Sequence, residues 1–162
     1  MEQSNWYAIY TAFRAEKRVK ERLDQAGIAN YIPLRVVEWE FEDGMKRVEV
    51  PLFSGCVFIR VISSELAKVL TITGIVSILQ EKKTPVMYSE QQMTSLHLLC
   101  DRADEIEVAI DDISASSARV IDGKLAGFEG EYNQERGQAI LRLPWVGNVC
   151  SLVPENCVEF LK

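Results

Sequence analysis

Residues 51–61 place the strongest constraint on the fold of this chain. They read Pro51-Leu52-Phe53-Ser54-Gly55-Cys56-Val57-Phe58-Ile59-Arg60-Val61, a proline-led turn with a Ser-Gly step that runs straight into an apolar, β-branched segment. This pattern predicts a loop that feeds a buried central strand. Any α+β domain can contain such a strand, so the pattern alone indicates a core and no particular activity.

Strand and helix patterns alternate on both sides of this segment. An aromatic and aliphatic run at residues 6–10 predicts a first strand, and apolar residues at helical spacing up to a stop at Gly27 predict a helix after it. A short strand ends near Pro33, and a hairpin follows with Asp43-Gly44 in its turn. Beyond the central strand we expect a helix at 63–70, a strand at 75–79 and a last helix that ends near Asp101.

The remainder of the chain, residues 103–162, differs from the first part in composition and in the spacing of its glycines. Residues 103–117 are acidic and then small and polar, which predicts a linker. In residues 118–162, Gly123, Gly127 and Gly130 are spaced through alternating apolar residues, and about five short strands are expected, enough for a small barrel. Because Pro144 and Pro154 interrupt this region, long helices are disfavoured. The predicted fold is α+β, with domains at 1–102 and 118–162.

Composition excludes several classes of protein. The chain has 162 residues, 48% of them hydrophobic, which fits one or two globular domains. It contains no apolar run of membrane-spanning length and no secretion signal at its start, so we expect a cytoplasmic protein that does not bind membranes. The four cysteines form no Cys-x-x-Cys pair and His97 is the only histidine, so neither a metal, a cofactor nor an enzyme is predicted.

Charge is distributed unevenly along the chain. The net charge is -6, with 12 basic and 13 acidic residues up to residue 101 and 6 basic and 11 acidic residues after it. A nucleic-acid contact should therefore be a local patch in the first part. Arg14, Arg18 and Arg22 stand four residues apart in the predicted first helix, so they would form one stripe. A solvated face with intrahelical pairs is the alternative interpretation of this stripe.

The string Pro-Leu-Phe-x-Gly-x-Val-Phe-Ile at 51–59 resembles the strand signature of the NusG family of transcription elongation factors. Ser54 and Cys56 stand where that family usually has a proline and a tyrosine. A hairpin just before the string and a segment at 119–132 that looks like a KOW motif agree in order with the family. The resemblance implies an NGN-type α/β sandwich, with an antiparallel or mixed sheet flanked by helices, and then an SH3-like KOW barrel.

The resemblance also implies a function without catalysis. Family members bind the clamp helices of RNA polymerase through an apolar depression and promote processive transcription, and Tyr10, Phe53 and Phe58 stand where it implies polymerase contacts. For each aromatic residue, the sheet core is the alternative. A ribosomal protein or other factor could bind the KOW domain, whose motif would include Gly123, Gly127 and Gly130.

Details such as Trp-Tyr-Ala-Ile-Tyr-Thr at 6–11 are similar to specialised paralogues of the RfaH or UpxY type, which act on few long operons such as those for surface polysaccharides. In that branch the first helix touches exposed non-template DNA, which implies nucleic-acid contacts for Arg14, Arg18 and Arg22. A general NusG-type factor and a KOW-containing RNA-binding or ribosome-binding protein are the alternatives. We expect the C-terminal barrel to be tethered flexibly, with little autoinhibition.

Overall fold

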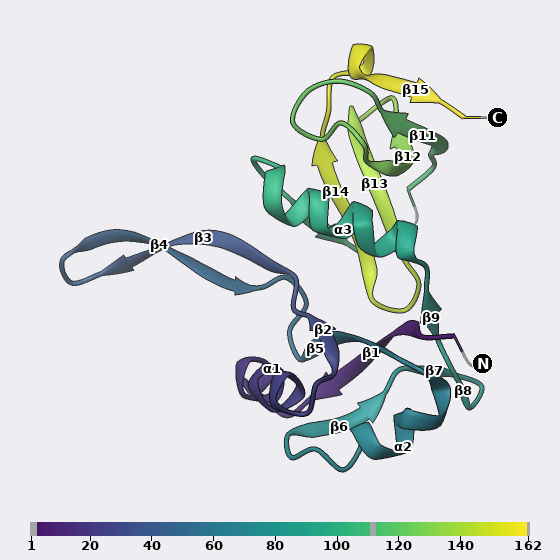
Figure 1. The fold of residues 1–162 in the computed structure, drawn as a ribbon. Helices are drawn as coiled ribbons and strands as arrows, with labels where there is room; N and C mark the ends of the chain where they lie inside the picture. The colour runs from purple at the N-terminus through teal and green to yellow at the C-terminus, as the bar shows by residue number, and fades with distance from the viewer. Residues whose placement is uncertain (1–2, 111–112, 162) are drawn as a thin grey trace. The chain divides into compact units, whose positions relative to one another are not determined.

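The computed structural model describes residues 3–110 and 113–161, and it divides the chain into two compact units, Met1–Ser89 and Glu90–Lys162 (Figure 1). Both units combine antiparallel sheets with a few helices. The predicted α+β class with antiparallel sheets is therefore confirmed.

The first unit is built on a five-stranded antiparallel sheet around its first strand, β1. The path runs β2-β5-β1-β6, and β9 also pairs with β1. The apolar segment at the centre of the sequence forms β5, which lies between β1 and β2 and is almost wholly buried, as predicted. The strand bounds are β1 Asn5–Thr11, β2 Ala29–Tyr31, β5 Cys56–Val61, β6 Ile75–Ile78 and β9 Met87–Tyr88.

One face of this sheet carries the apolar core. Tyr7, Ile9, Val57 and Ile59 point to this face and pack with Val19 and Leu23 of α1 (Glu16–Gln25) and Val69 of α2 (Leu66–Val69). A 3-10 turn, η1 (Ser63–Glu65), leads into α2. Burying these aliphatic side chains stabilises the unit by roughly 1.5–3 kcal/mol for each side chain.

The loop before β5 is tied to the start of α1. Gly55 has φ +71, a conformation that glycine adopts without strain, and its N–H donates a 2.9 Å hydrogen bond to Oε1 of Glu16. The Gly55 carbonyl accepts a 2.9 Å bond from the N–H of Thr11 at the end of β1. The Ser-Gly step thus fixes where β1, α1 and β5 meet.

Between β2 and β5 the chain forms a long hairpin of β3 (Leu34–Phe41) and β4 (Gly44–Pro51), which extends away from the five-stranded sheet (Figure 1). Its ladder runs from Leu34 opposite Pro51 to Phe41 opposite Gly44. The four-residue turn Phe41–Gly44 contains the expected Asp43 and Gly44, with Glu42 and Asp43 as its two central residues. A smaller hairpin, β7 (Gln80–Glu81) with β8 (Thr84–Pro85), follows later.

The second unit contains a six-stranded antiparallel sheet in the order β10-β14-β13-β12-β11-β15. The last helix, α3 (Glu90–Arg102), packs against β12 and β13. A 3-10 turn, η2 (Glu155–Cys157), precedes the last strand. The strand bounds are β10 Glu107–Ala109, β11 Ser116–Val120, β12 Glu129–Asn133, β13 Gln138–Leu143, β14 Gly147–Leu152 and β15 Val158–Phe160.

The division between the units lies earlier than the expected boundary at residue 102. The hydroxyl of Ser95, fully buried on α3, donates a 2.9 Å hydrogen bond to the carbonyl of Glu129 and accepts a 3.1 Å bond from the Glu129 N–H. Gln92 donates a 3.2 Å bond to the carbonyl of Arg142. These bonds fasten α3 to the second sheet, so the helix expected to close the first domain belongs to the second unit.

The expected linker, 103–117, also holds ordered structure. Its residues 107–109 form β10, which pairs with β14, and Ile113 is buried against Ile140 and Cys150. Residues 111 and 112 of this linker lie outside the described residues. The acidic composition of the segment suggests a linker, but polar and apolar residues alternate in Glu105-Ile106-Glu107-Val108. This alternation is the pattern of a short strand.

Candidate functional site

The face of the first sheet opposite its helix-covered core is aromatic. In the ladder Tyr10 lies opposite Cys56, Phe58 lies opposite both Ala8 and Tyr31, and Tyr88 lies opposite Trp6. Side chains of directly opposed residues lie on the same side of a sheet. We call the side that carries Tyr10, Tyr31, Cys56, Phe58 and Tyr88 the tyrosine face.

Phe58 is the centre of an aromatic cluster on the tyrosine face. Its ring meets Tyr88 edge to face at a centroid distance of 5.4 Å and Phe53 at 6.4 Å. The Phe58 side chain is 0% exposed, and Phe53 and Tyr88 are buried as well. Phe53 and Phe58 thus support the surface from within, and the core interpretation accounts for their burial.

Tyr10 is the exposed member of the three predicted polymerase contacts, with 37% of its surface accessible. Partial burial, and secondarily the neighbouring Cys56, raise the pKa of its hydroxyl above the usual value. Tyr10 therefore presents a neutral ring and a hydroxyl donor, held in place by the β1–β5 ladder. That combination of an apolar body and a polar tip is common at protein interfaces.

Cys56 fills the place next to Tyr10 as a small apolar group. It is buried, and burial raises the pKa of its thiol to about 12. Since a thiolate is needed for nucleophilic or redox chemistry, the thiol is inert at neutral pH.

The three candidate arginines do not form the single helical stripe that their spacing predicts. Helix α1 begins at Glu16, so Arg14 lies in the preceding turn, where it adopts φ 58 and places its guanidinium 5.1 Å from the Phe13 ring centroid. Arg18 is on α1 and exposed. The positive φ of Arg14 is not helical, so the helix cannot include it, and the N-cap residue Ala15 makes no side-chain capping bond.

Arg22 has a structural role in the first unit. It is half-buried, and its Nη1 donates a 2.6 Å hydrogen bond to the carbonyl of Thr73. The neighbouring Gly74, φ +99, has no room for a side chain, since a Cβ there would lie 2.9 Å from Val19. Arg22 thus secures the loop before β6 on α1, and the exposed cations of this region are Arg14, Lys17 and Arg18.

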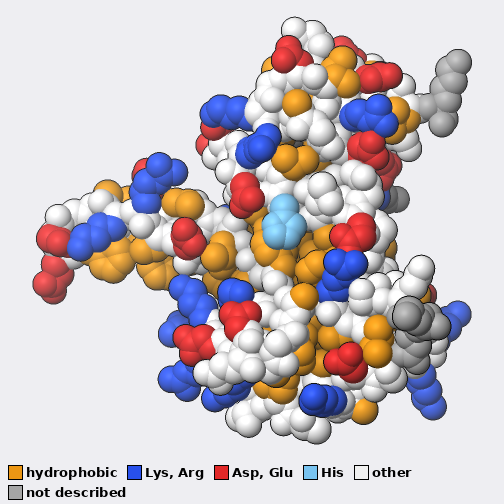
Figure 2. All heavy atoms as spheres, viewed as in Figure 1, with side chains coloured by type: hydrophobic (Ala, Val, Ile, Leu, Met, Phe, Trp, Pro, Cys, Tyr) orange, Lys and Arg blue, Asp and Glu red, His pale blue; other side chains and the backbone are white. Residues whose placement is uncertain are grey.

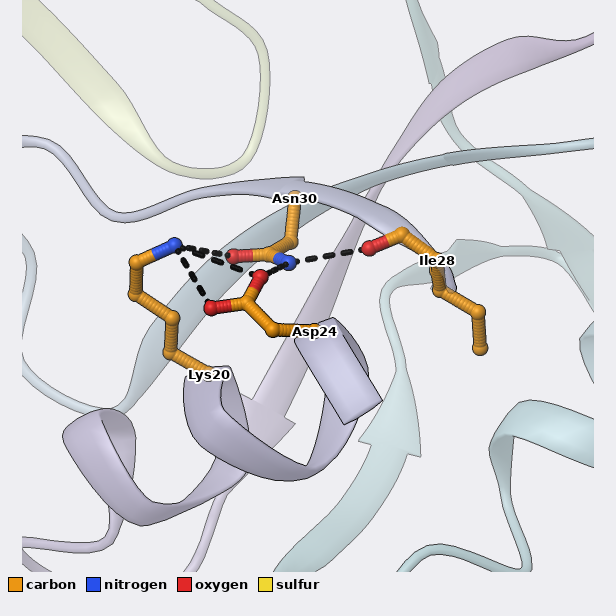
Figure 3. Close-up of polar contacts among 4 residues, drawn as sticks. All are labelled: Lys20, Asp24, Ile28 and Asn30. Carbon is orange, nitrogen blue, oxygen red and sulfur yellow. Dashed lines mark hydrogen bonds and ion pairs between the residues drawn. The ribbon is translucent and has the colours of Figure 1, made fainter. Parts of the chain in front are cut away.

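A second cation of α1 is also engaged within the chain (Figure 3). Lys20 Nζ lies 3.3 Å from Asp24 Oδ2 and donates a 3.0 Å hydrogen bond to Asn30 Oδ1. Asn30 Nδ2 donates to Asp24 Oδ1 at 2.7 Å and to the Ile28 carbonyl at 2.9 Å. The Asn30 hydrogen bond is the main cause that lowers the pKa of Asp24. This network joins the end of α1 to β2.

The three glycines of the predicted KOW motif have two different roles. Gly123 and Gly127 adopt φ +83 and +102 in the turn between β11 and β12. Gly130 lies inside β12, where a Cβ would sit 2.7 Å from the Ile140 carbonyl oxygen and 2.8 Å from the Phe128 ring. Backbone conformation thus requires the first two, and close packing requires the third.

Several exposed aromatic side chains have no distinguishing signal in the sequence, among them Phe13 and Trp39. Phe13 is 84% exposed beside Arg14, and Trp39 on β3 is 55% exposed. The strand pattern of residues 34–41 contains Trp39, but which side of a hairpin remains uncovered is a property of the folded chain.

A family model described as "Transcription termination factor nusG" matches residues 4–97, more than half of the chain. The chain belongs to the NusG family. Members of the NusG family are transcription factors and not enzymes, and they bind RNA polymerase. The family predicted from the string at 51–59 is thereby confirmed.

A solved structure of similar fold covers nearly the whole chain. It is a NusG of Thermotoga maritima, described as "Domain interaction in Thermotoga maritima NusG", with a TM-score of 0.51 at 16% identity. The similarity covers 98% of both chains. No curated protein matches the chain.

Among the described residues, none of the helices has the length and apolar character needed to cross a membrane. The same residues contain no cluster of His, Cys, Asp and Glu suited to a metal ion.

Proposed function

We propose that this NusG family member is a transcription elongation and antitermination factor that binds the clamp helices of RNA polymerase through its tyrosine face. The observation that carries the proposal is the exposed Tyr10 on a rigid sheet, above the buried Phe58 cluster, in a chain of a polymerase-binding family. An aromatic anchor on a preformed surface loses little conformational entropy on binding, which favours affinity.

A role on specific long operons, as in the RfaH and UpxY type, is the finer proposal. It relies on DNA recruitment by the turn and first helix, where Phe13, Arg14 and Arg18 form an exposed aromatic and cationic group. Such a group suits unpaired bases and phosphates of a displaced non-template strand. Arg22 contributes to the loop that supports this surface.

We further propose that the second unit is an SH3-like KOW domain that binds a ribosomal protein or another factor. Its antiparallel strands and its glycine-dependent β11–β12 turn support this. We also retain the expectation of little autoinhibition by this unit.

Affinity purification of the tagged full-length chain from its own cells tests the proposal. We expect RNA polymerase subunits to co-purify after nuclease treatment, at a yield well above that of ribosomal proteins. Recovery of ribosomes without polymerase would instead favour an RNA-binding or ribosome-binding KOW protein. Sequencing the DNA bound by the recovered polymerase separates the specialised role, with few operons, from a general one.

A further inference from the structure

The β3–β4 hairpin has two chemically different faces. Because opposed residues share a side, the register separates the side chains of its two strands cleanly. We call one side the hairpin apolar face; it carries Arg35, Val37, Trp39, Phe41, Lys46, Val48 and Val50. The other, the hairpin acidic face, carries Leu34, Val36, Glu38, Glu40, Met45, Arg47 and Glu49.

The hairpin apolar face has three valines, two aromatic residues and two cations, but no carboxylate. Trp39 is 55% exposed and Phe41 41% exposed. Lys46 lies opposite Trp39, with its ammonium 5.4 Å from the Phe41 ring centroid and 2.9 Å from Asp43 of the turn. Figure 2 shows hydrophobic side chains gathered along one side of the hairpin.

A two-stranded hairpin is marginally stable in water without a covered apolar side. The strands pair with each other and with no further strand of the described chain, and the exposed Trp39 and Phe41 remain in solvent. Trp and Arg are the residues that most often dominate binding energy at protein interfaces. The face therefore has the composition of an uncovered interface.

The charges of the face indicate what covers it. Arg35 is exposed on a face whose two strands contribute no carboxylate to it, so this face complements an apolar patch whose rim is acidic. Single-stranded nucleic acid fits less well, because aliphatic Val37, Val48 and Val50 occupy positions that base stacking would require to be aromatic.

We propose that the hairpin apolar face is a second docking surface for RNA polymerase, separate from the tyrosine face, and that it binds an apolar polymerase surface with an acidic rim. This inference rests on the proposed polymerase-binding function. The two surfaces lie on different sheets of the first unit, so different strand ladders hold them.

Affinity of the purified full-length chain for purified RNA polymerase tests this inference with matched variants. Trp39→Ala removes the aromatic anchor, and we expect the dissociation constant to rise about tenfold or more. Met45→Ala, an exposed apolar truncation on the hairpin acidic face, is its control and should change the constant by less than about twofold.

Two charge-reversal variants keep the test valid if Trp39→Ala disturbs the hairpin. Arg35→Glu leaves every apolar residue of the face in place and should weaken binding and reduce its salt dependence. Arg47→Glu makes the same charge change on the other face and should leave the affinity unchanged. Equal affinities of wild type, Trp39→Ala and Arg35→Glu would overturn the inference.

Two further experimental outcomes would identify a different binding partner for the hairpin apolar face. Loss of binding to a fluorescent oligodeoxythymidine in Trp39→Ala, with polymerase affinity intact, would assign the face to single-stranded nucleic acid and overturn the proposal. A dimer in sedimentation velocity that Trp39→Ala dissolves would assign it to a second copy, with the same consequence. If the wild-type chain does not bind polymerase at all, the proposed function fails before the hairpin is tested.

Discussion

At the scale of single residues, burial decides what each side chain of the tyrosine face can do. Tyr10 is partly exposed on this face, whereas Phe58 is enclosed by Phe53 and Tyr88. The burial of Phe58 follows from the predicted buried strand, whereas its ladder position opposite Tyr31 and Ala8 is a long-range pairing that a strand pattern does not specify. Sequence patterns identify which residues face a sheet side, whereas the folded chain decides which remain in contact with solvent.

The thiol of Cys56 offers a test of this burial. Because its pKa is raised to about 12, we expect little alkylation by iodoacetamide at pH 8 in the folded protein, and faster alkylation of the partly exposed Cys157. Between the ordinary thiol pKa and about 12, only the unfolded chain ionises at Cys56. Stability should therefore fall as the pH rises through that window.

Peptide mass spectrometry over a time course measures both rates. Urea-unfolded protein is the control, in which the two cysteines should react at similar rates. Equal labelling of Cys56 and Cys157 in the folded state would contradict the buried environment of the tyrosine face.

At the scale of secondary-structure elements, the sequence predicts the types of element well and their partners less well. The central strand, the first helix and the β3–β4 hairpin follow from apolar periodicity and turn residues. The sequence does not mark the start of α1, because Ala12 to Ala15 contain no Ser, Thr, Asp or Asn that could cap the helix. The sheet that receives α3 depends on the fit of Ser95 to the Glu129 backbone, a tertiary contact without a local signal.

The two arginines of α1 should behave differently when each is replaced by alanine. Arg18→Ala should weaken binding to single-stranded DNA and reduce the salt slope by about 0.7, without loss of stability. Arg22→Ala breaks the bond to the Thr73 carbonyl, so we expect it to lower the free energy of unfolding by about 1 kcal/mol.

Fluorescence anisotropy with labelled DNA at several salt concentrations, together with urea denaturation, separates the two effects. Lys17→Ala, another exposed cation of α1, is the matched control for lost charge alone. A stability loss in Arg18→Ala without a change in DNA binding would reverse the roles assigned to Arg18 and Arg22.

At the scale of the whole molecule, the order of motifs predicts the family, and the match of residues 4–97 confirms it. The domain boundaries are harder to predict, because the acidic composition of 103–117 indicates a linker although its residues 107–109 add a strand to the second sheet. Composition indicates how readily a segment is solvated. Whether a short edge strand such as β10 forms depends instead on a partner strand with free backbone groups, here β14.

The most direct test of the account is the affinity of purified RNA polymerase for full-length Tyr10→Ala. We expect its dissociation constant to rise at least about tenfold over wild type, since a partly buried aromatic anchor is lost. Met87→Ala is the control: Met87 is exposed on the same sheet but lies opposite Tyr7, on the other side. It should bind like wild type. Equal affinities for wild type and a folded Tyr10→Ala would contradict a polymerase contact through the tyrosine face.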